Sequence, residues 1–141
     1  MNRSSKDTAT RKFTDMDAPA LRASMGRFEG VCVVATVNPD GTPDGSIFMP
    51  SMPDDEHVIL MLADNNTRAN LERTGIARMV YDVANPAAED KAARHAGARL
   101  DLALVRPEGE TTEEHRRVAE RLPHMNPAVM ILRIERILPV G

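Results

Sequence analysis

The sequence predicts a mainly β fold with flanking helices, in which about six strands close into a small antiparallel barrel. Short apolar runs rich in β-branched residues, such as VCVVATV at 31–37, are typical of buried strands. The segment NPDG at 38–41 is a strong turn signal, because Pro39 presets one backbone angle and Gly41 tolerates positive φ. No helical pattern separates the next apolar runs, which indicates an antiparallel meander.

The strands are expected at residues 31–37, 42–51, 58–63, 76–83, 98–105 and 128–140. Pro43 and Pro50 belong at strand ends, because proline cannot donate a ladder hydrogen bond. Closing such a set of strands into a barrel removes the exposed sheet edges that promote aggregation.

Helices are expected around these strands. Thr14 and Asp17 resemble a helix start, and apolar residues at helical spacing predict a helix over 15–28 with Leu21, Met25 and Phe28 facing the core. A short helix is expected to begin near Asn66.

Two further helices are expected in the second half of the chain. A polar helix over 85–96 would have Asn85 as its cap and Gly97 as its stop. This helix could be a lid, a dimer contact or a loop feature without a functional role. A capping box of Thr111 with Glu114 predicts a last helix, which Pro123 ends.

Length and composition indicate one soluble domain, over residues 13–141, after a mobile polar tail at 1–12. The net charge of −3 gives no reason to expect a nucleic-acid partner, and no apolar run is long enough to cross a membrane. The chain starts without a secretory signal pattern, and its single cysteine, Cys32, lies inside an apolar strand run. We therefore expect a cytoplasmic protein in which Cys32 is a core residue.

Motifs of side-chain catalysis are missing. The four histidines show no metal-ligand spacing, and neither a nucleophile motif nor a phosphate-binding glycine loop is present. Asp54, Asp55 and Glu56 are interpreted as a solvated turn. We expect no metal site and no catalytic side chain.

The segment LADNNTRANLERTG at 62–75 allows two interpretations. It is a helix start, where Asn, Thr and Arg can simply satisfy the first turn. Alternatively, the free N–H groups of that turn, the Thr67 hydroxyl and the Arg68 charge could bind a phosphate. The residues alone leave both interpretations open.

The run from Gly30 to Asp82 resembles the pyridoxamine-phosphate-oxidase-like family of FMN-binding split barrels. The resemblance lies in three pieces in order: ATV at 35–37, DG with Pro43 at 40–43, and T..NL at 67–71. It implies a six-stranded antiparallel split β-barrel, an FMN cofactor and a homodimer with FMN at the subunit interface. It also implies an oxidoreductase that uses flavin-mediated hydride or electron transfer on a small-molecule substrate or an electron donor such as a nicotinamide.

The resemblance also implies the cofactor-binding residues. The flavin phosphate would lie at Asn66, Thr67 and Arg68. The ring would lie along the second predicted strand, at 42–51. Leu62 and Ala63 would lie near the ribityl chain. The ring-binding residues would be Ser46, Ile47, Phe48 and Met49.

The chain departs from the family pattern at two of these places. Asn66 stands where a basic residue is common, and Asp101 where a glycine is common. Three hypotheses follow: a flavin-dependent oxidoreductase, a non-catalytic FMN-binding or electron-transfer protein, and a flavin-free barrel for a deazaflavin or haem.

Overall fold

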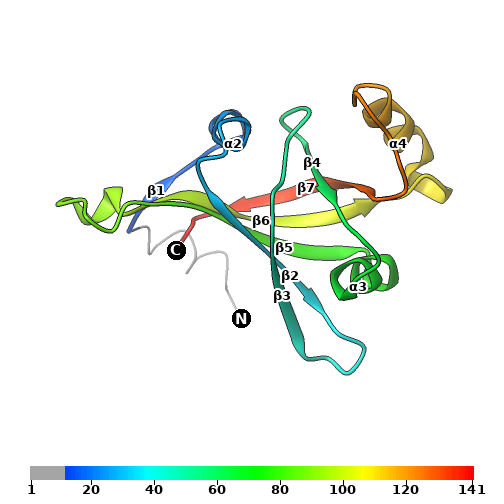
Figure 1. Ribbon diagram of the computed structural model, residues 1–141, viewed down its shortest axis with the longest axis horizontal. Coiled ribbons are helices and arrows are strands. Elements are labelled where there is room, and N and C mark those ends of the chain that lie inside the picture. Colours follow the sequence, from blue (N-terminus) through cyan, green and yellow to red (C-terminus); the bar gives the residue numbers. More distant parts are fainter. Residues whose placement is uncertain (1–11) are drawn as a thin grey trace.

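The computed structural model describes residues 12–141, so the predicted polar tail at 1–12 lies outside the described residues except for Lys12. Its main element is one strongly curled antiparallel sheet that forms an open half-barrel, with three helices beside it (Figure 1). The predicted class, mainly β with flanking helices and a split barrel of six antiparallel strands, is confirmed. The predicted closure that removes exposed edges is wrong, because the sheet stays open with β3 and β4 at its two ends.

The strands are β1 (Thr14–Asp15), β2 (Val31–Val37), β3 (Pro43–Phe48), β4 (His57–Met61), β5 (Ile76–Ala84), β6 (His95–Val105) and β7 (Val129–Leu138). They follow the order β3-β2-β5-β6-β7-β4 with antiparallel neighbours, and the short β1 joins β6 in parallel. All six segments predicted as strands form strands, because their β-branched residues suit the pleated, half-buried surface of a sheet.

The predicted meander is correct for the β2–β3 hairpin and wrong for β4. β3 and β4 lie at opposite ends of the strand order, and β4 pairs with β7 instead. A single isolated backbone bridge, between Ser51 and Ile59, pairs the segment after β3 with β4. That segment contains Pro50 and Pro53, which cannot donate ladder hydrogen bonds, so the chain leaves the sheet before it returns.

The helices are α2 (Ala18–Gly26), α3 (Asn66–Thr74) and α4 (Thr112–Ala119). α2 begins where Asp17 accepts a hydrogen bond from the Ala20 N–H at 3.0 Å, so Asp15 belongs to β1 and not to the helix. Leu21 and Met25 are buried as predicted, but Phe28 is 74% exposed. The helix ends before Phe28, and a left-handed backbone at that residue (φ 55°) turns its side chain outward.

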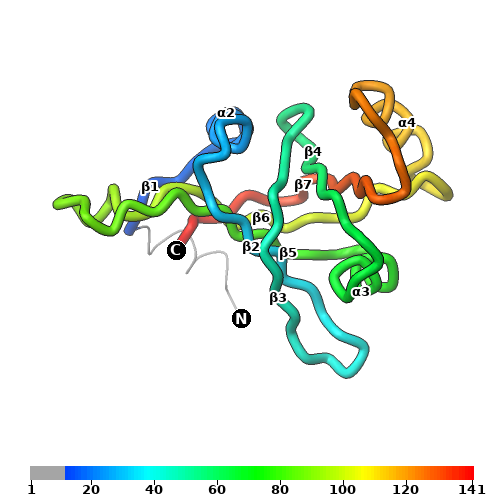
Figure 2. Tube along the Cα trace, in the orientation of Figure 1, coloured from blue at the N-terminus to red at the C-terminus, as the bar shows by residue number. Residues whose placement is uncertain are grey.

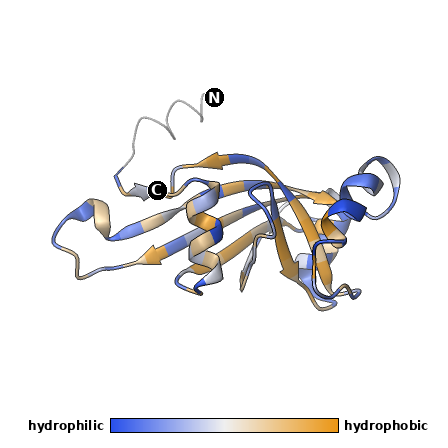
Figure 3. Cartoon of the chain, turned by 90° about the horizontal axis from the view of Figure 1, so that it is seen from above, coloured by the Kyte–Doolittle hydropathy of each residue, from blue (hydrophilic) through white to orange (hydrophobic). Residues whose placement is uncertain are grey.

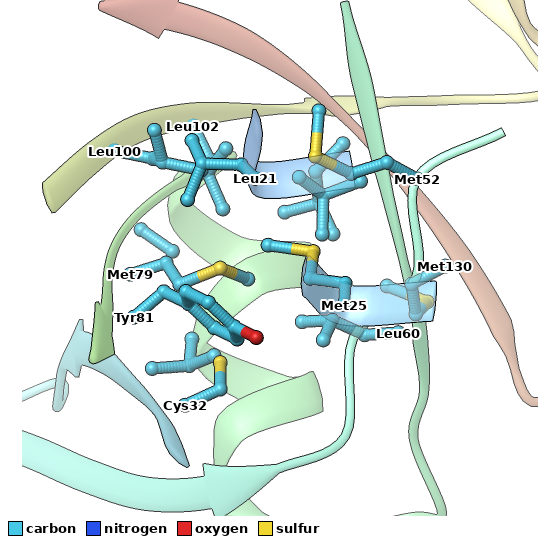
Figure 4. Close-up of a cluster of buried hydrophobic side chains, with 14 of the residues drawn as sticks. Leu21, Met25, Cys32, Met52, Leu60, Met79, Tyr81, Leu100, Leu102 and Met130 are labelled. Atoms are coloured by element: carbon cyan, nitrogen blue, oxygen red, sulfur yellow. The ribbon is translucent and has the colours of Figure 1, made fainter. Parts of the chain in front are cut away.

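The core fills the concave side of the half-barrel. Leu21 and Met25 of α2 pack onto residues from β2, β4, β5, β6 and β7, as Figure 4 shows. Coloured by hydropathy, the strands carry long apolar stretches next to polar ones (Figure 3). Cys32 lies in this core, and burial raises the pKa of its thiol to about 12, which confirms the prediction that it is a core residue.

The predicted helix over Asn85–Ala96 does not form. β5 and β6 continue as a hairpin, paired as far as Ala84 and His95, and their connection contains only a short 3-10 turn, η1 (Lys91–Ala93). The resulting arm projects beyond the rest of the sheet (Figure 2). The segment had helix-forming residues but no apolar stripe to bury, whereas the strands on either side gain hydrogen bonds by extending.

Gly97, predicted as a helix stop, instead allows a close backbone approach within the sheet. A Cβ built on Gly97 would lie 1.9 Å from the Tyr81 carbonyl oxygen. We therefore expect Gly97→Ala to lower the free energy of unfolding by about 3 kcal/mol, because the strand must shift to relieve the clash. Urea denaturation measures this, with Gly26→Ala as control, since a Cβ there meets nothing within 4 Å. Equal stability of the two variants would contradict the close approach.

The predicted last helix forms as α4, after the 3-10 turn η2 (Gly109–Thr111). The predicted capping box of Thr111 with Glu114 does not form. The Thr111 hydroxyl accepts from the Arg106 N–H at 2.7 Å and donates to the Arg106 carbonyl at 2.9 Å, so it closes the preceding loop. Glu114 turns toward the sheet, where two basic side chains bind it. Charge pairing across elements therefore replaces the local capping interaction.

Candidate functional site

The start of α3 has a side-chain cap. The Asn65 side-chain oxygen accepts a hydrogen bond from the Arg68 N–H at 2.9 Å, and Gly75 in a left-handed conformation ends the helix. The interpretation of this segment as a capped helix is confirmed. The first N–H groups of a helix have no partner within it, so those of Asn66 and Thr67 could still bind an anion. Thr67 itself is only 2% exposed.

Polar side chains of α3 fasten it to the end of the β2–β3 hairpin. The Asn66 amide donates to the Asn38 side-chain oxygen at 2.7 Å, and the Asn70 amide donates to the same oxygen at 3.0 Å and to the Thr36 hydroxyl at 3.1 Å. Arg73 donates to the Val37 carbonyl. The start of α3 therefore lies beside the turn from which β3 begins. Asn38 is a contact that sequence reasoning missed, because only its role in the turn was visible.

Arg68 turns away from the helix start. Its Nε donates to Glu72 at 2.7 Å, and its Nη1 donates to the carbonyls of Leu62 at 3.0 Å and Pro127 at 2.6 Å. These bonds join α3 to the ends of the strands β4 and β7. Arg68 thus places a positive charge near the helix start while most of its donors serve the fold.

Leu62 and Ala63, the two predicted residues at the end of β4, differ in burial. Leu62 is fully buried in the core, and its N–H donates to the Ala128 carbonyl at 2.8 Å. Ala63 is exposed and precedes the turn into α3. Ala63 is therefore accessible to a ligand at the helix start, whereas the Leu62 side chain serves the core.

β3 is an edge strand of the sheet, because its one partner in the strand order is β2. Ser46 and Phe48 are half-buried, and Phe48 packs against the core. Ile47 points to the opposite face and is 72% exposed, and Met49, just past the end of β3, is 73% exposed. The backbone of β3 on the side away from β2 has no strand partner among the described residues.

Exposed apolar side chains gather around this edge of the sheet. Ile47 lies opposite Val33 of β2, and Val31, at the start of the same strand, is 56% exposed. Phe28, with its left-handed backbone, is also exposed. We call Phe28, Val31, Ile47 and Met49 the outer apolar patch. Contiguous exposed patches of large apolar side chains are common at binding and assembly surfaces.

A buried charge cluster could not be predicted from the sequence, because its members are far apart in the chain. The two ring nitrogens of His57 lie 3.0 Å from Asp54 Oδ1 and 2.6 Å from Glu114 Oε2, and Arg133 donates to Glu114 Oε1 at 2.6 Å. Asp54, predicted to lie in a solvated turn, is thus a partner of a buried histidine. Burial raises its pKa, but hydrogen bonds from Glu56 and His57 outweigh this and hold the pKa below its usual value.

No protein-family model matches the sequence, and no curated protein matches it either. Solved structures match it in fold at low identity. An FMN-binding protein of Syntrophomonas wolfei subsp. wolfei matches with a TM-score of 0.57 and 21% identity, over 86% of this chain and 84% of that one. A pyridoxamine 5′-phosphate oxidase-like protein of Listeria innocua matches with a TM-score of 0.51 and 12% identity, over 88% and 98%. HutZ, a haem storage protein of Vibrio cholerae, matches with a TM-score of 0.50 and 17% identity, over 84% and 89%.

The fold is that of the pyridoxamine-phosphate-oxidase-like split barrels. This split barrel has its predicted phosphate residues at the start of α3 and its predicted ring residues along β3, and the hairpin turn joins the two groups. None of the helices in residues 12–141 has the length and apolar character needed to span a bilayer.

Proposed function

We propose that this split barrel is a cytoplasmic FMN-binding flavoprotein, an oxidoreductase that acts on a small substrate as a homodimer. The observation that carries the proposal is the open edge of β3 beside the start of α3. An elongated ligand with a polar ring edge and a terminal phosphate needs these two features in this arrangement.

The edge of β3 fits the ring of a flavin. In an antiparallel pair, alternate backbone groups point away from the partner strand, so part of the backbone over Ser46–Phe48 is open to a ligand. These N–H and C=O groups can pair with the donors and acceptors of a flavin ring edge. Ile47 and Met49 supply apolar surface that would keep water from the ring.

The start of α3 fits a phosphate through its backbone N–H groups and the Thr67 hydroxyl more than through Arg68. The N–H groups of Asn66 and Thr67 and the positive end of the helix favour an anion. Arg68 adds a nearby charge, but its Nε and Nη1 already bond within the fold. We therefore assign the phosphate first to the helix start and second to Arg68.

Bound FMN supplies hydride-transfer or electron-transfer chemistry, and the chain itself binds, orients and shields it. The backbone of β3 fixes the orientation of the ring, and the outer apolar patch would be covered by a second subunit, which closes the site to water. The chain then needs no acid–base pair of its own, which fits the missing catalytic motifs.

A comparison of FMN with riboflavin tests the assignment of the phosphate. We expect the protein to bind FMN more tightly than riboflavin, and Thr67→Ala to weaken FMN binding about tenfold with less than a twofold change for riboflavin. Fluorescence titration measures both ligands. Thr67→Ser, which keeps the hydroxyl, is expected to retain affinity, and Thr74→Ala at the other end of α3 is the matched control. Equal binding of FMN and riboflavin by the wild type would place the phosphate elsewhere.

The absorption spectrum of the purified protein separates the remaining hypotheses. A flavin spectrum with reduction by a nicotinamide and turnover supports an oxidoreductase, whereas bound flavin without turnover supports an FMN-binding or electron-transfer protein. A haem or deazaflavin spectrum, or a colourless protein that FMN does not stabilise against heat, would overturn the FMN assignment.

A further inference from the structure

A second pocket lies between α3 and α4, which stand at the same end of the sheet in Figure 1. Its volume is about 410 Å³, within the range of small-molecule sites. The end of β6, the loop after it and the start of β7 complete its walls. We call it the Arg106 pocket. It shares with the predicted flavin residues only Arg68.

The floor of the Arg106 pocket is apolar. Val105, Val129 and Ile131 are buried side chains on neighbouring strands, and they belong to a small core cluster under α4. Met125 at the rim of the pocket is 42% exposed. A methionine side chain adapts to ligands of different shape, so the pocket suits an apolar body rather than a single rigid group.

One positive charge dominates the rim. Arg68 and Glu72 both line the pocket, but they pair with each other at 2.7 Å and cancel. Arg106 is half-buried, and its Nη2 donates to the Glu72 backbone carbonyl at 2.9 Å, which orients the guanidinium without neutralising it. Glu108, the other acid of the rim, is exposed, so solvent screens it more strongly. The pocket therefore favours an anionic group.

His115 adds a neutral hydrogen-bonding group to the rim. Burial lowers the pKa of its imidazole, which keeps the ring uncharged near neutral pH. A neutral imidazole can donate one hydrogen bond and accept another.

The wall that carries His115 is held in place by the buried charge cluster. Glu114, the preceding residue of α4, is bound by His57 and by Arg133 of the sheet. The pocket is thus preformed by interactions that do not depend on a ligand. Preformed pockets bind with a smaller loss of conformational entropy.

We propose that the Arg106 pocket is a second binding site that takes a small carboxylate with an apolar body. The guanidinium of Arg106 binds the carboxylate, since its planar fork matches the two oxygens, and His115 supplies a further hydrogen bond. The apolar part of the ligand lies on Val129, Ile131 and Met125. This site does not depend on the proposed binding of FMN at β3.

Binding of 2-naphthoate and of its neutral analogue 2-naphthamide tests the proposal by calorimetry on the full chain. We expect naphthoate to bind more tightly than the amide. Arg106→Gln is expected to weaken naphthoate binding about tenfold and to change amide binding less than twofold. Arg117→Gln removes an exposed arginine of α4 that does not line the pocket, and it is the matched control.

A steric variant keeps the test decisive if Arg106→Gln unfolds. Met125→Trp places a larger side chain at the exposed rim, where the fold tolerates it, and is expected to weaken binding of both probes at least about fivefold. Equal affinities for the two probes would overturn the recognition of a carboxylate. Unchanged naphthoate binding in Met125→Trp, or no saturable binding by the wild type, would overturn the site itself. Neither result would bear on FMN binding.

Discussion

Glu114→Ala is expected to lower the free energy of unfolding by about 3 kcal/mol at pH 7. The substitution leaves His57 Nε2 and Arg133 Nη1 without the carboxylate that lies 2.6 Å from each. The buried His57 ring lies between the two acids, with its nitrogens 3.0 Å from Asp54 Oδ1 and 2.6 Å from Glu114 Oε2. Removing Glu114 leaves one buried ring nitrogen without its hydrogen-bond partner and Arg133 without one of its two acidic partners. Alanine favours helix, so the loss does not arise from α4 itself.

The effect of Glu114→Ala should depend on pH in a defined direction. Burial raises the pKa of Glu114, but the hydrogen bond from His57 and the charge of Arg133 outweigh it and hold the pKa below its ordinary value of 4.5. A carboxyl with a lowered folded pKa stabilises the fold above its unfolded pKa, and this contribution disappears as pH falls through the folded value. The difference between wild type and variant should therefore be full at pH 7 and shrink below about pH 4.5.

Urea denaturation across this pH range measures the prediction, and Glu113→Ala is the matched control. Glu113 is the neighbouring residue of α4, and its exposed pair with Arg116 should contribute less than about 0.5 kcal/mol. The prediction fails if Glu114→Ala lowers the free energy of unfolding no more than Glu113→Ala does. It also fails if the difference in this free energy between wild type and Glu114→Ala does not change with pH. Either result would show that the buried cluster does not anchor α4.

Ile47→Asp is expected to raise the dissociation constant of the proposed homodimer at least about a hundredfold, because it places a charge in the centre of an apolar interface. Ile47 is 72% exposed within the chain and lies in the outer apolar patch on β3. If FMN binds at the subunit interface, its affinity should fall together with dimerisation. Analytical ultracentrifugation measures the first effect and flavin titration the second.

Met61→Asp is the control for Ile47→Asp. Met61 is also an exposed apolar residue of a strand, at 57%, but β4 lies at the other end of the strand order from β3. A wild type that is monomeric, or two variants that dimerise equally well, would contradict the assignment of the interface. FMN affinity that stays unchanged in monomeric Ile47→Asp would place the cofactor within one subunit.

The sequence by itself determined the elements whose signals are local. The run at 31–37 forms β2 because β-branched residues favour extended backbone, and NPDG turns it into β3. α3 begins and ends where Asn65 and Gly75 supply the cap and the left-handed stop. Each of these depends on interactions within a few residues, so pattern alone was sufficient.

Only the tertiary structure decided which distant segments meet. In the structure, β4 pairs with β7 rather than with β3. β5 and β6 continue into the segment predicted as a polar helix, because sheet hydrogen bonds outweigh helix propensity where no apolar stripe is buried. Arg68 donates hydrogen bonds to the carbonyls of Leu62 and Pro127, and His57 lies within hydrogen-bond distance of Glu114. These contacts join residues from separate elements, and charges that are far apart in sequence become partners only when burial removes the competing water.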